Sequence, residues 1–408
     1  MTTEIKQISS RLDLVKPSAS AWVSQAAKKL KSQGHDVIDM GLGEPDFDTP
    51  AHIIEAAYQA AKDGQTRYPP TGGTAALKQA VVDKFKRENQ LSYSASQIIV
   101  SNGAKQVIFN ALMASLEAGQ EVLLCAPYFG QYKDMVLILG GKPVELECHA
   151  ENDFLATAEA IDQAITSKTR WIILNAPSNP SGALYSRAQL NSIGEVIGRH
   201  PHVMVMADEI YEHIVFDGKE FISFAKACPN LINRTLIVNG VSKAYAMTGW
   251  RIGYGAGNEE LIQAMIKVQS QISSGACSVA QAAAVAALNG PQTSVAEFLN
   301  AFERRRDLVV ERISEIDGLT LDPPGGAFYA FVGCEYFIGA TTPTGSVVED
   351  DNQFTQYLLE DAGVATVPGS AYGLSPFFRL STATSDDILD LAITRIANSL
   401  TKLRTRKR

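Results

Sequence analysis

The middle of the chain alternates short apolar runs with stretches of helical periodicity, and this alternation limits the fold more than any other feature. The apolar runs lie at residues 98–100, 121–125, 171–174, 203–207 and 235–238. Between the first two runs, residues 107–116 carry apolar side chains at the spacing of one helix face. Strands that are apolar throughout and separated by helices form mostly parallel sheets with helices on both faces. The pattern therefore predicts an α/β sandwich for this part of the chain.

The two ends of the chain carry a different pattern. After about Arg306 the sequence predicts a helix, a strand pair within residues 326–332, a further helix and a last strand. The Gly-Glu-Pro-Asp run at residues 43–46 is typical of a turn between domains. We therefore expect a large domain at residues 45–305 and a smaller α+β domain built from residues 1–44 together with residues 306–408.

Composition argues against several classes of function. The chain has 408 residues with 44 acidic and 36 basic side chains, a net charge of −8. That charge argues against nucleic acid or an anionic membrane as the partner, and no apolar run approaches the ~18 residues of a membrane span. The first fifteen residues lack the apolar stretch of a signal peptide. The five cysteines are scattered without a Cys-x-x-Cys pair, so we expect no metal site, no disulfide framework and a cytoplasmic location.

Polar residues gather where the predicted strands stop. Asn175, Asp208 and Lys243 each follow an apolar run, as do Gly103 and Ser242. In open α/β sheets, ligands bind beyond the carboxyl ends of the strands. We therefore expect one binding site to collect these residues.

The lysine and the arginine that follow the last of these strands have two interpretations each. Lys243 is either a solvated surface charge or a buried amine of lowered pKa, which forms a Schiff base with a carbonyl compound. Arg251 is either half of a surface salt bridge or a planar fork that binds phosphate. The helix start after Gly103 is either a plain strand-to-helix turn or a set of backbone N–H groups that bind phosphate.

Three further residues are open in the same way. Asp208 is a helix N-cap or a carboxylate that faces the pyridinium nitrogen of a cofactor. Tyr211 is a core residue or a phenol beside the ring oxygen of that cofactor. Asn179 is part of a Pro-rich turn or an amide donor to the same oxygen.

Taken as one ordered set, these residues resemble those of class I aminotransferases, which are pyridoxal-phosphate enzymes of fold type I. The run from Ser242 to Gly253 matches the family's lysine signature, Ser-x-x-x-x-x-Thr-Gly-x-Arg-x-Gly. Within the family, the chain most resembles bacterial aspartate aminotransferases of the subgroup that includes aspartate/prephenate enzymes. The matching runs lie at residues 15–20, 43–50, 105–106, 179–182, 208–211 and 246–251. The resemblance covers residues 14–397 and implies a large domain with a mostly parallel, seven-stranded sheet between helices.

The resemblance implies a role for each cofactor-binding residue. Lys243 would hold pyridoxal phosphate as a Schiff base and then carry the proton in the reaction, and Asp208 would pair with the ring nitrogen. Asn179 and Tyr211 would hydrogen-bond the ring oxygen, and Phe129 would stack on the ring. The phosphate would be bound by Ser242, Arg251 and the backbone of Gly103, Ala104 and Lys105.

The resemblance also implies a second subunit and a carboxylate site. Tyr68 resembles the tyrosine that reaches the phosphate of a second subunit, which implies a homodimer with shared sites. Tyr68 would join Lys243 and Asp208 as a catalytic residue. Arg379 would bind the α-carboxylate of the substrate as a bidentate pair, and Gly43 would line the substrate site by its backbone.

A dicarboxylate substrate needs a second cation. No arginine lies between Arg251 and Arg304, so the arginine that one aminotransferase subgroup takes from the partner subunit is missing. The subgroup resembled here uses a lysine at the phosphate-binding helix, which matches Lys105. Lys16, beside Ser18, is a solvated charge or matches a lysine that this subgroup links to prephenate.

The chain departs from the family pattern at two turns. Phe129 stands where the family usually has tryptophan, and Gly130-Gln131 follows it in place of the usual Val-Ser. Ser381-Thr382 replaces the usual Ser-Tyr. Phe129 has no indole N–H to donate, so we expect a roomier pocket where Phe129 and Asn179 border the substrate. The main expectation is ping-pong transfer of an amino group from aspartate or glutamate to a 2-oxo acid such as 2-oxoglutarate. The alternatives are an aromatic or prephenate aminotransferase, a pyridoxal-phosphate-dependent lyase, and an inactive regulator, which would carry a basic DNA-binding domain.

Overall fold

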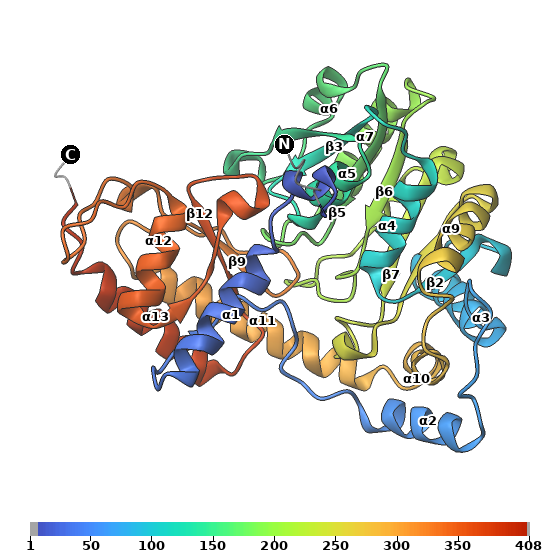
Figure 1. Cartoon of the computed structure of the whole chain (residues 1–408), viewed down its shortest axis with the longest axis horizontal. Helices are drawn as coiled ribbons and strands as arrows, with labels where there is room; N and C mark the ends of the chain where they lie inside the picture. The colour runs from blue at the N-terminus through green and yellow to red at the C-terminus, as the bar shows by residue number, and fades with distance from the viewer. Residues whose placement is uncertain (1–6, 406–408) are drawn as a thin grey trace, which may run out of the picture.

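The computed structural model describes residues 7–405, and a large sheet organises most of them (Figure 1). Within that range, its seven strands follow the order β2-β8-β7-β6-β5-β3-β4. The strands are β2 (Ile98–Ser101), β3 (Glu121–Ala126), β4 (Lys142–Glu147), β5 (Thr169–Asn175), β6 (Met204–Asp208), β7 (Thr235–Gly240) and β8 (Gly253–Ala256). β8 runs antiparallel to both of its neighbours, and the other neighbouring pairs are parallel. The prediction of a mostly parallel sheet is therefore confirmed.

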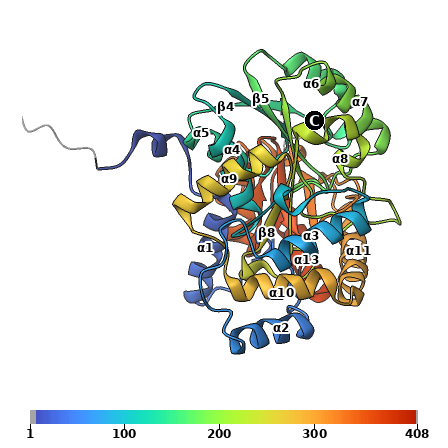
Figure 2. The same ribbon diagram turned by 90° about the vertical axis from the view of Figure 1, so that its right-hand side faces the viewer.

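Helices cover both faces of this sheet (Figure 2). β2 shows the reason, because all of its residues are buried. Ile99 packs in one cluster with α4 (Ala104–Ser115), whereas its neighbours Ile98 and Val100 pack in another cluster with α3 (Ala75–Lys84). Successive side chains of a strand point to opposite faces, so a strand that is apolar throughout requires a helix layer on each side.

The same alternation places the other helices. α4, α5 and α9 pack on one face of the sheet, and α3, α7 and α10 pack on the other. The remaining bounds are α1 (Ala19–Ser32), α2 (Ala51–Lys62), α5 (Gln131–Ile138), α6 (Ala158–Ala164), α7 (Arg187–Gly198), α8 (Phe224–Ala227), α9 (Glu259–Ile272), α10 (Ser278–Asn289), α11 (Thr293–Ser314), α12 (Asp351–Tyr357) and α13 (Asp386–Leu400). No helix within residues 7–405 is both long and apolar enough to span a membrane.

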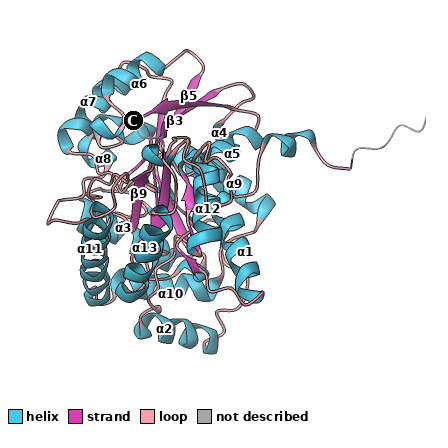
Figure 3. Cartoon of the chain, turned by 90° about the vertical axis from the view of Figure 1, so that its left-hand side faces the viewer, coloured by secondary structure: helices cyan, strands magenta, loops and turns pink. Residues whose placement is uncertain are grey.

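Two small sheets lie at the other end of the molecule, with α1, α12 and α13 (Figures 1 and 3). One of them is antiparallel, in the order β11-β12-β9. The other pairs β1 with β10 in parallel. Their strands are β1 (Ile38–Asp39), β9 (Tyr329–Gly333), β10 (Val364–Ala365), β11 (Val367–Pro368) and β12 (Phe377–Ser381). The predicted α+β character of this part is confirmed.

The strand pair predicted within residues 326–332 is wrong. β9 is the strand in this stretch, and it pairs with β12 from far along the chain. Gly326 instead forms an isolated bridge with Val215, and the backbone N–H of Ala327 donates to the carbonyl of Ile214 at 2.9 Å. Residues 326 and 327 therefore pair with residues 214 and 215, which lie far away in the sequence, and not with a neighbouring strand.

The division into two domains stays a prediction. Its boundary after residue 305 lies within α11, which continues unbroken to Ser314. The ends of the predicted small domain, residues 1–6 and 406–408, lie outside the described residues.

Candidate active site

The carboxyl ends of β5, β6 and β7 border a cavity of about 370 Å³. The predicted site residues that line it are Ser18, Gly43, Ala104, Lys105, Phe129, Asn179, Asp208, Tyr211, Ser242, Lys243, Arg251 and Arg379. The fold thus brings together, at one edge of the large sheet, side chains from segments that are far apart in the sequence.

Asp208 is the last residue of β6 and is 5% exposed. The hydroxyl of Tyr132, on α5, donates a hydrogen bond to its Oδ2 atom at 2.5 Å. Burial raises the pKa of Asp208 to about 6, and the hydrogen bond from Tyr132 opposes that rise. Above this pH the carboxylate is a buried anion, which can hold a cationic group placed in the cavity.

Lys243 follows the end of β7 and lines the same cavity. Its Nζ atom donates to the carbonyl of Gly43 at 2.5 Å and lies 5.6 Å from the ring centroid of Phe328. Burial, and after it the positive charge of Arg379, lower the pKa of Lys243 to about 8. An amine that loses its proton this easily can act as a nucleophile toward a carbonyl carbon.

The start of α4 forms a cradle for an anion. Gly103 precedes the helix with φ +84°, and a Cβ atom there would lie 2.2 Å from Nη2 of Arg251. A Cβ atom at Gly253 would lie 2.1 Å from the backbone nitrogen of Ala104. Arg251 has a left-handed backbone, φ 56°, and its Nη1 atom donates to the carbonyl of Thr248 at 2.8 Å. A helix N-terminus and a guanidinium group that meet in this way favour a phosphate.

Arg379, on β12, places a buried cation in the cavity, where it is 2% exposed. Nη1 donates to Oδ1 of Asn179 at 3.0 Å, and Nη2 donates to the carbonyl of Gly41 at 2.5 Å. Within residues 7–405, its Nε atom has no hydrogen-bond partner, and the bonds of Nη1 and Nη2 go to neutral groups. A buried charge without a counter-ion is costly, so this arrangement favours an anionic ligand.

Lys105, on the first turn of α4, adds a fourth ammonium or guanidinium group to the lining of the cavity. Its Nζ atom lies 5.4 Å from the ring centroid of Phe129. Burial, and after it the charge of Arg251, lower the pKa of Lys105. Nearby, the side-chain amide of Gln131 donates to Oγ of Ser18 at 3.0 Å, which ties the start of α5 to the segment before α1.

The remaining predicted site residues, Lys16, Tyr68 and Gly103, do not line the cavity of a single chain. Gly103 lies behind the cradle, against Arg251. Lys16 is exposed, and Tyr68 is 95% exposed. The predicted role of Tyr68 involves a second copy of the chain, and Lys16 makes no contact with the cavity that would test its role. The roles of both residues therefore stay predictions.

Comparison with known proteins shows the family. The chain matches the model of aminotransferase class I and II over residues 35–396. It is 52% identical to the aspartate aminotransferase of Rhizobium meliloti (strain 1021) over 397 residues, which is 97% of each chain. It is 50% identical to the probable aspartate/prephenate aminotransferase of Rickettsia bellii (strain RML369-C), over 95% of this chain and 98% of that one. A crystal structure of the aspartate aminotransferase from Rhizobium meliloti superposes with a TM-score of 0.95 at 52% identity, covering 98% of this chain and 100% of that chain.

The chain belongs to the class I and II aminotransferases. This membership implies pyridoxal phosphate as the cofactor, which carries a phosphate dianion, an aldehyde and a basic ring nitrogen. The cavity offers a group for each: the cradle at Gly103 and Arg251 for the phosphate, Lys243 for the aldehyde and Asp208 for the nitrogen. The donors in this aminotransferase therefore fit the cofactor that its family implies.

Sequence reasoning missed three residues that also line the cavity, Tyr132, Tyr329 and Glu44. The hydroxyl oxygens of Tyr211 and Tyr329 lie 2.8 Å apart, and the Thr248 hydroxyl donates to the carboxylate of Glu44. A signal existed for Tyr132, since it lies in the first turn of α5, three residues after Phe129, and the two rings are in contact. Tyr329 gave no such signal, because its contact depends on the pairing of β9 with β12.

Proposed function

We propose that this aminotransferase moves the amino group of L-aspartate or L-glutamate to a 2-oxo acid such as 2-oxoglutarate, by a ping-pong mechanism with pyridoxal phosphate. One observation carries the proposal. A single cavity holds a partly buried amine of lowered pKa, Lys243, a buried carboxylate, Asp208, and a buried guanidinium without a carboxylate partner, Arg379. The relative from Rhizobium meliloti, which bears the name aspartate aminotransferase, supports the choice of substrate.

In this proposal, the chain holds the cofactor ring from several sides. Lys243 would hold the aldehyde carbon of the cofactor through its amine, and Asp208 would pair with the ring nitrogen. Asn179 and Tyr211 hydrogen-bond the ring oxygen, and Phe129 packs on the ring face. Tyr132 keeps Asp208 oriented and ionised through its 2.5 Å hydrogen bond.

The phosphate group binds at the cradle. Arg251 and Ser242 donate to its oxygens, together with the backbone N–H groups that begin α4 at Ala104. Tyr68 from a second copy of the chain completes this contact, so we propose a homodimer with shared sites. The five cysteines are free thiols, which suits the reducing cytoplasm that we propose as its location.

When bound, the cofactor supplies an electron sink for the bonds at the substrate α-carbon. Asp208, ionised above a pKa of about 6, keeps the ring nitrogen protonated. With the substrate in place, the Lys243 amine would take the proton from the α-carbon of the substrate. Its pKa of about 8 leaves a useful fraction of free base near neutral pH.

The substrate is held by its carboxylates. Arg379 binds the α-carboxylate along the edge that carries its unpartnered Nε atom. Lys105 binds the distal carboxylate of aspartate or glutamate, since no arginine lies between Arg251 and Arg304 to do so.

A second candidate is transamination of prephenate or of an aromatic amino acid. Phe129 replaces the larger tryptophan of the family, and Thr382 is 1% exposed with a hydroxyl that lacks a partner within residues 7–405. Ser18 lines the cavity, and Lys16 lies close to it in the sequence. The relative from Rickettsia bellii carries prephenate in its name.

A spectral half-reaction tests the proposal. Protein loaded with pyridoxal phosphate is mixed in turn with aspartate, glutamate, phenylalanine and alanine, and the absorbance of the bound cofactor is followed. Conversion to the amine form by aspartate and glutamate, reversed by a 2-oxo acid, is the expected result. Conversion by phenylalanine alone would favour the second candidate. Turnover that needs no 2-oxo acid would favour a lyase and overturn both.

A further inference from the structure

A buried polar cluster outside the lining of the cavity is centred on the carboxylate of Glu212, whose side chain is 3% exposed. Oε1 accepts hydrogen bonds from Nζ of Lys84 and, at 2.6 Å, from Nδ2 of Asn239. Oε2 accepts from Nδ2 of Asn89 at 2.7 Å, and Asn89 also accepts from Nζ of Lys84 at 2.7 Å. The carboxylate is therefore bonded on both oxygens by donors from two separate segments of the chain, the helical stretch that ends at Asn89 and β7.

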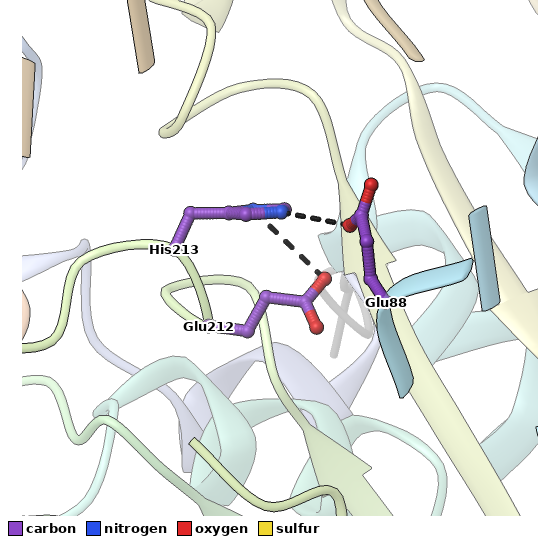
Figure 4. Close-up of side chains that lie close together, drawn as sticks. All are labelled: Glu88, Glu212 and His213. Atoms are coloured by element: carbon purple, nitrogen blue, oxygen red, sulfur yellow. Dashed lines mark hydrogen bonds and ion pairs between the residues drawn. The ribbon is translucent and has the colours of Figure 1, made fainter. Parts of the chain in front are cut away.

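This cluster has the residue types of a metal site but holds its own cation. Glu88, Glu212 and His213 bring one potential ligand atom each within 4.8 Å of one another (Figure 4). The ammonium group of Lys84, 0% exposed, contacts Glu212 and lies 3.4 Å from Oε2 of Glu88. A metal ion here would face a buried positive charge at close range, which is strongly unfavourable.

The buried negative charge of Glu212 is compensated by the buried positive charge of Lys84. Burial by itself would raise the pKa of Glu212, yet the neighbouring charge of Lys84 holds that pKa below its ordinary value. An ionised pair inside the protein persists only where further hydrogen bonds satisfy both groups, as Asn89 and Asn239 do here. Separating Lys84 from Glu212 would leave each charge buried without its partner, so the cluster resists small displacements.

The position of Glu212 in the chain connects the cluster to the predicted cofactor site. Glu212 directly follows Tyr211 and lies four residues after Asp208, on the turn that leaves β6. Asn239 lies on β7, four residues before Lys243. The 2.6 Å hydrogen bond between Asn239 and Glu212 therefore joins the two strand exits that carry the cofactor-facing side chains.

We propose that Glu212 is a positioning residue for the cofactor site, which fixes the turn carrying Asp208 and Tyr211 against the strand exit carrying Lys243. The inference rests on the proposed function of these three residues. Glu212 itself does not line the cavity, so it acts through Tyr211 and Asp208 and not on the reacting atoms.

The test compares Glu212→Gln with Glu209→Gln. Glu209 is a matched control, because it is a buried carboxylate on the same turn. Its Oε1 atom accepts from Oγ of Ser223 and the backbone N–H of Phe224, both at 2.9 Å, and neither partner belongs to β7. Burial, and after it the charge of Glu212, raise the pKa of Glu209 to about 8, so neutral glutamine resembles the form present near neutral pH.

Five quantities are measured for both variants loaded with pyridoxal phosphate. They are the pH midpoint of the visible absorbance of the bound cofactor, the Kd for the cofactor, kcat and KM with aspartate, and the Tm. For Glu212→Gln we expect the midpoint to rise by about 0.5 to 1 unit, because the hydrogen bond from Tyr211 that holds it down is misplaced. We expect kcat to fall roughly tenfold while KM stays within about twofold. For Glu209→Gln we expect the midpoint and kcat of the wild type.

A Glu212→Gln variant with a lowered Tm but the midpoint and kcat of the wild type would overturn the proposal, because the cluster would then be structural only. If that variant does not fold, Asn239→Ala replaces it. This change leaves the Lys84–Glu212 pair intact and removes the link between Glu212 and β7, together with the bond from the backbone N–H of Gly240 to Oδ1 of Asn239. The same rise of the midpoint is expected, and an unchanged midpoint overturns the proposal. Absence of transamination by the wild-type protein would instead refute the proposed function, and the midpoint and Kd would still report on the positioning.

Discussion

The hydrogen bond between Tyr132 and Asp208 gives the sharpest prediction about the site. Tyr132→Phe removes the donor to Oδ2 of Asp208 and leaves the ring in place. A hydrogen bond to a charged group contributes about 1.5 to 3 kcal/mol, which corresponds to about 1 to 2 pKa units. Because the bond stabilises the ionised carboxylate, its loss raises the pKa of Asp208 from about 6 to the range of about 7 to 8.

This shift has a measurable consequence for cofactor binding. A carboxylate holds the protonated ring nitrogen only when it is itself deprotonated, so affinity falls as the pH drops below the pKa of Asp208. With a pKa of about 7.5 in the variant, the ionised fraction of Asp208 at about pH 6.5 falls from roughly three quarters to roughly one tenth. We therefore expect pyridoxal phosphate to bind Tyr132→Phe roughly eightfold more weakly than the wild type at that pH, with a smaller difference at about pH 9.

The assay is the Kd for pyridoxal phosphate, measured by fluorescence from about pH 5 to about pH 9. Tyr128→Phe is the matched control, because the Tyr128 hydroxyl donates to a carboxylate oxygen of Glu145 over the same 2.5 Å, and neither residue lines the cavity. The titrations of the cofactor itself are common to all three proteins and cancel. Equal pH profiles for Tyr132→Phe and the wild type would refute the reasoning.

Three further predictions concern single side chains of the cavity. Lys243→Ala is expected to abolish the visible absorbance of the bound cofactor and turnover, and turnover at the wild-type rate would remove Lys243 from its role. Lys105→Ala is expected to lower kcat/KM roughly a hundredfold for aspartate and less than about threefold for alanine and phenylalanine, since only aspartate loses a charge contact; equal losses would exclude Lys105 as the partner of the distal carboxylate. Gly103→Ala is expected to weaken pyridoxal phosphate binding by at least about tenfold, because its Cβ would lie 2.2 Å from Nη2 of Arg251 in a left-handed position, and an unchanged Kd would show that the cradle has room.

The fold of the large sheet could be predicted because its central strands are apolar on both faces. β2, β5, β6 and β7 all appear in the sequence as continuous apolar runs, and their shared carboxyl edge indicated where a ligand binds. β4 was not foreseen, because it is a partly exposed edge strand in which charged residues interrupt the apolar ones. β8 was not foreseen, because its Gly-Tyr-Gly-Ala sequence carries little strand signal.

The site could be predicted where a residue follows a strand or lies in a family motif. Asp208 and Lys243 have both signals. Tyr329 has neither, because its hydroxyl meets Tyr211 only through the long-range pairing of β9 with β12. The role of Glu212 could not be predicted for the same reason. Its partners come from α3, from the helical turn that follows α3 and from β7, and no local sequence pattern brings them together.

The most direct test of the central claim is the fate of the amino nitrogen. Protein loaded with pyridoxal phosphate is given nitrogen-labelled aspartate and unlabelled 2-oxoglutarate, and the products are followed by NMR. Our account predicts that nitrogen-labelled glutamate forms together with an equal amount of oxaloacetate, which carries no label, and that no ammonia is released. Release of labelled ammonia, or consumption of aspartate without 2-oxoglutarate, would contradict it.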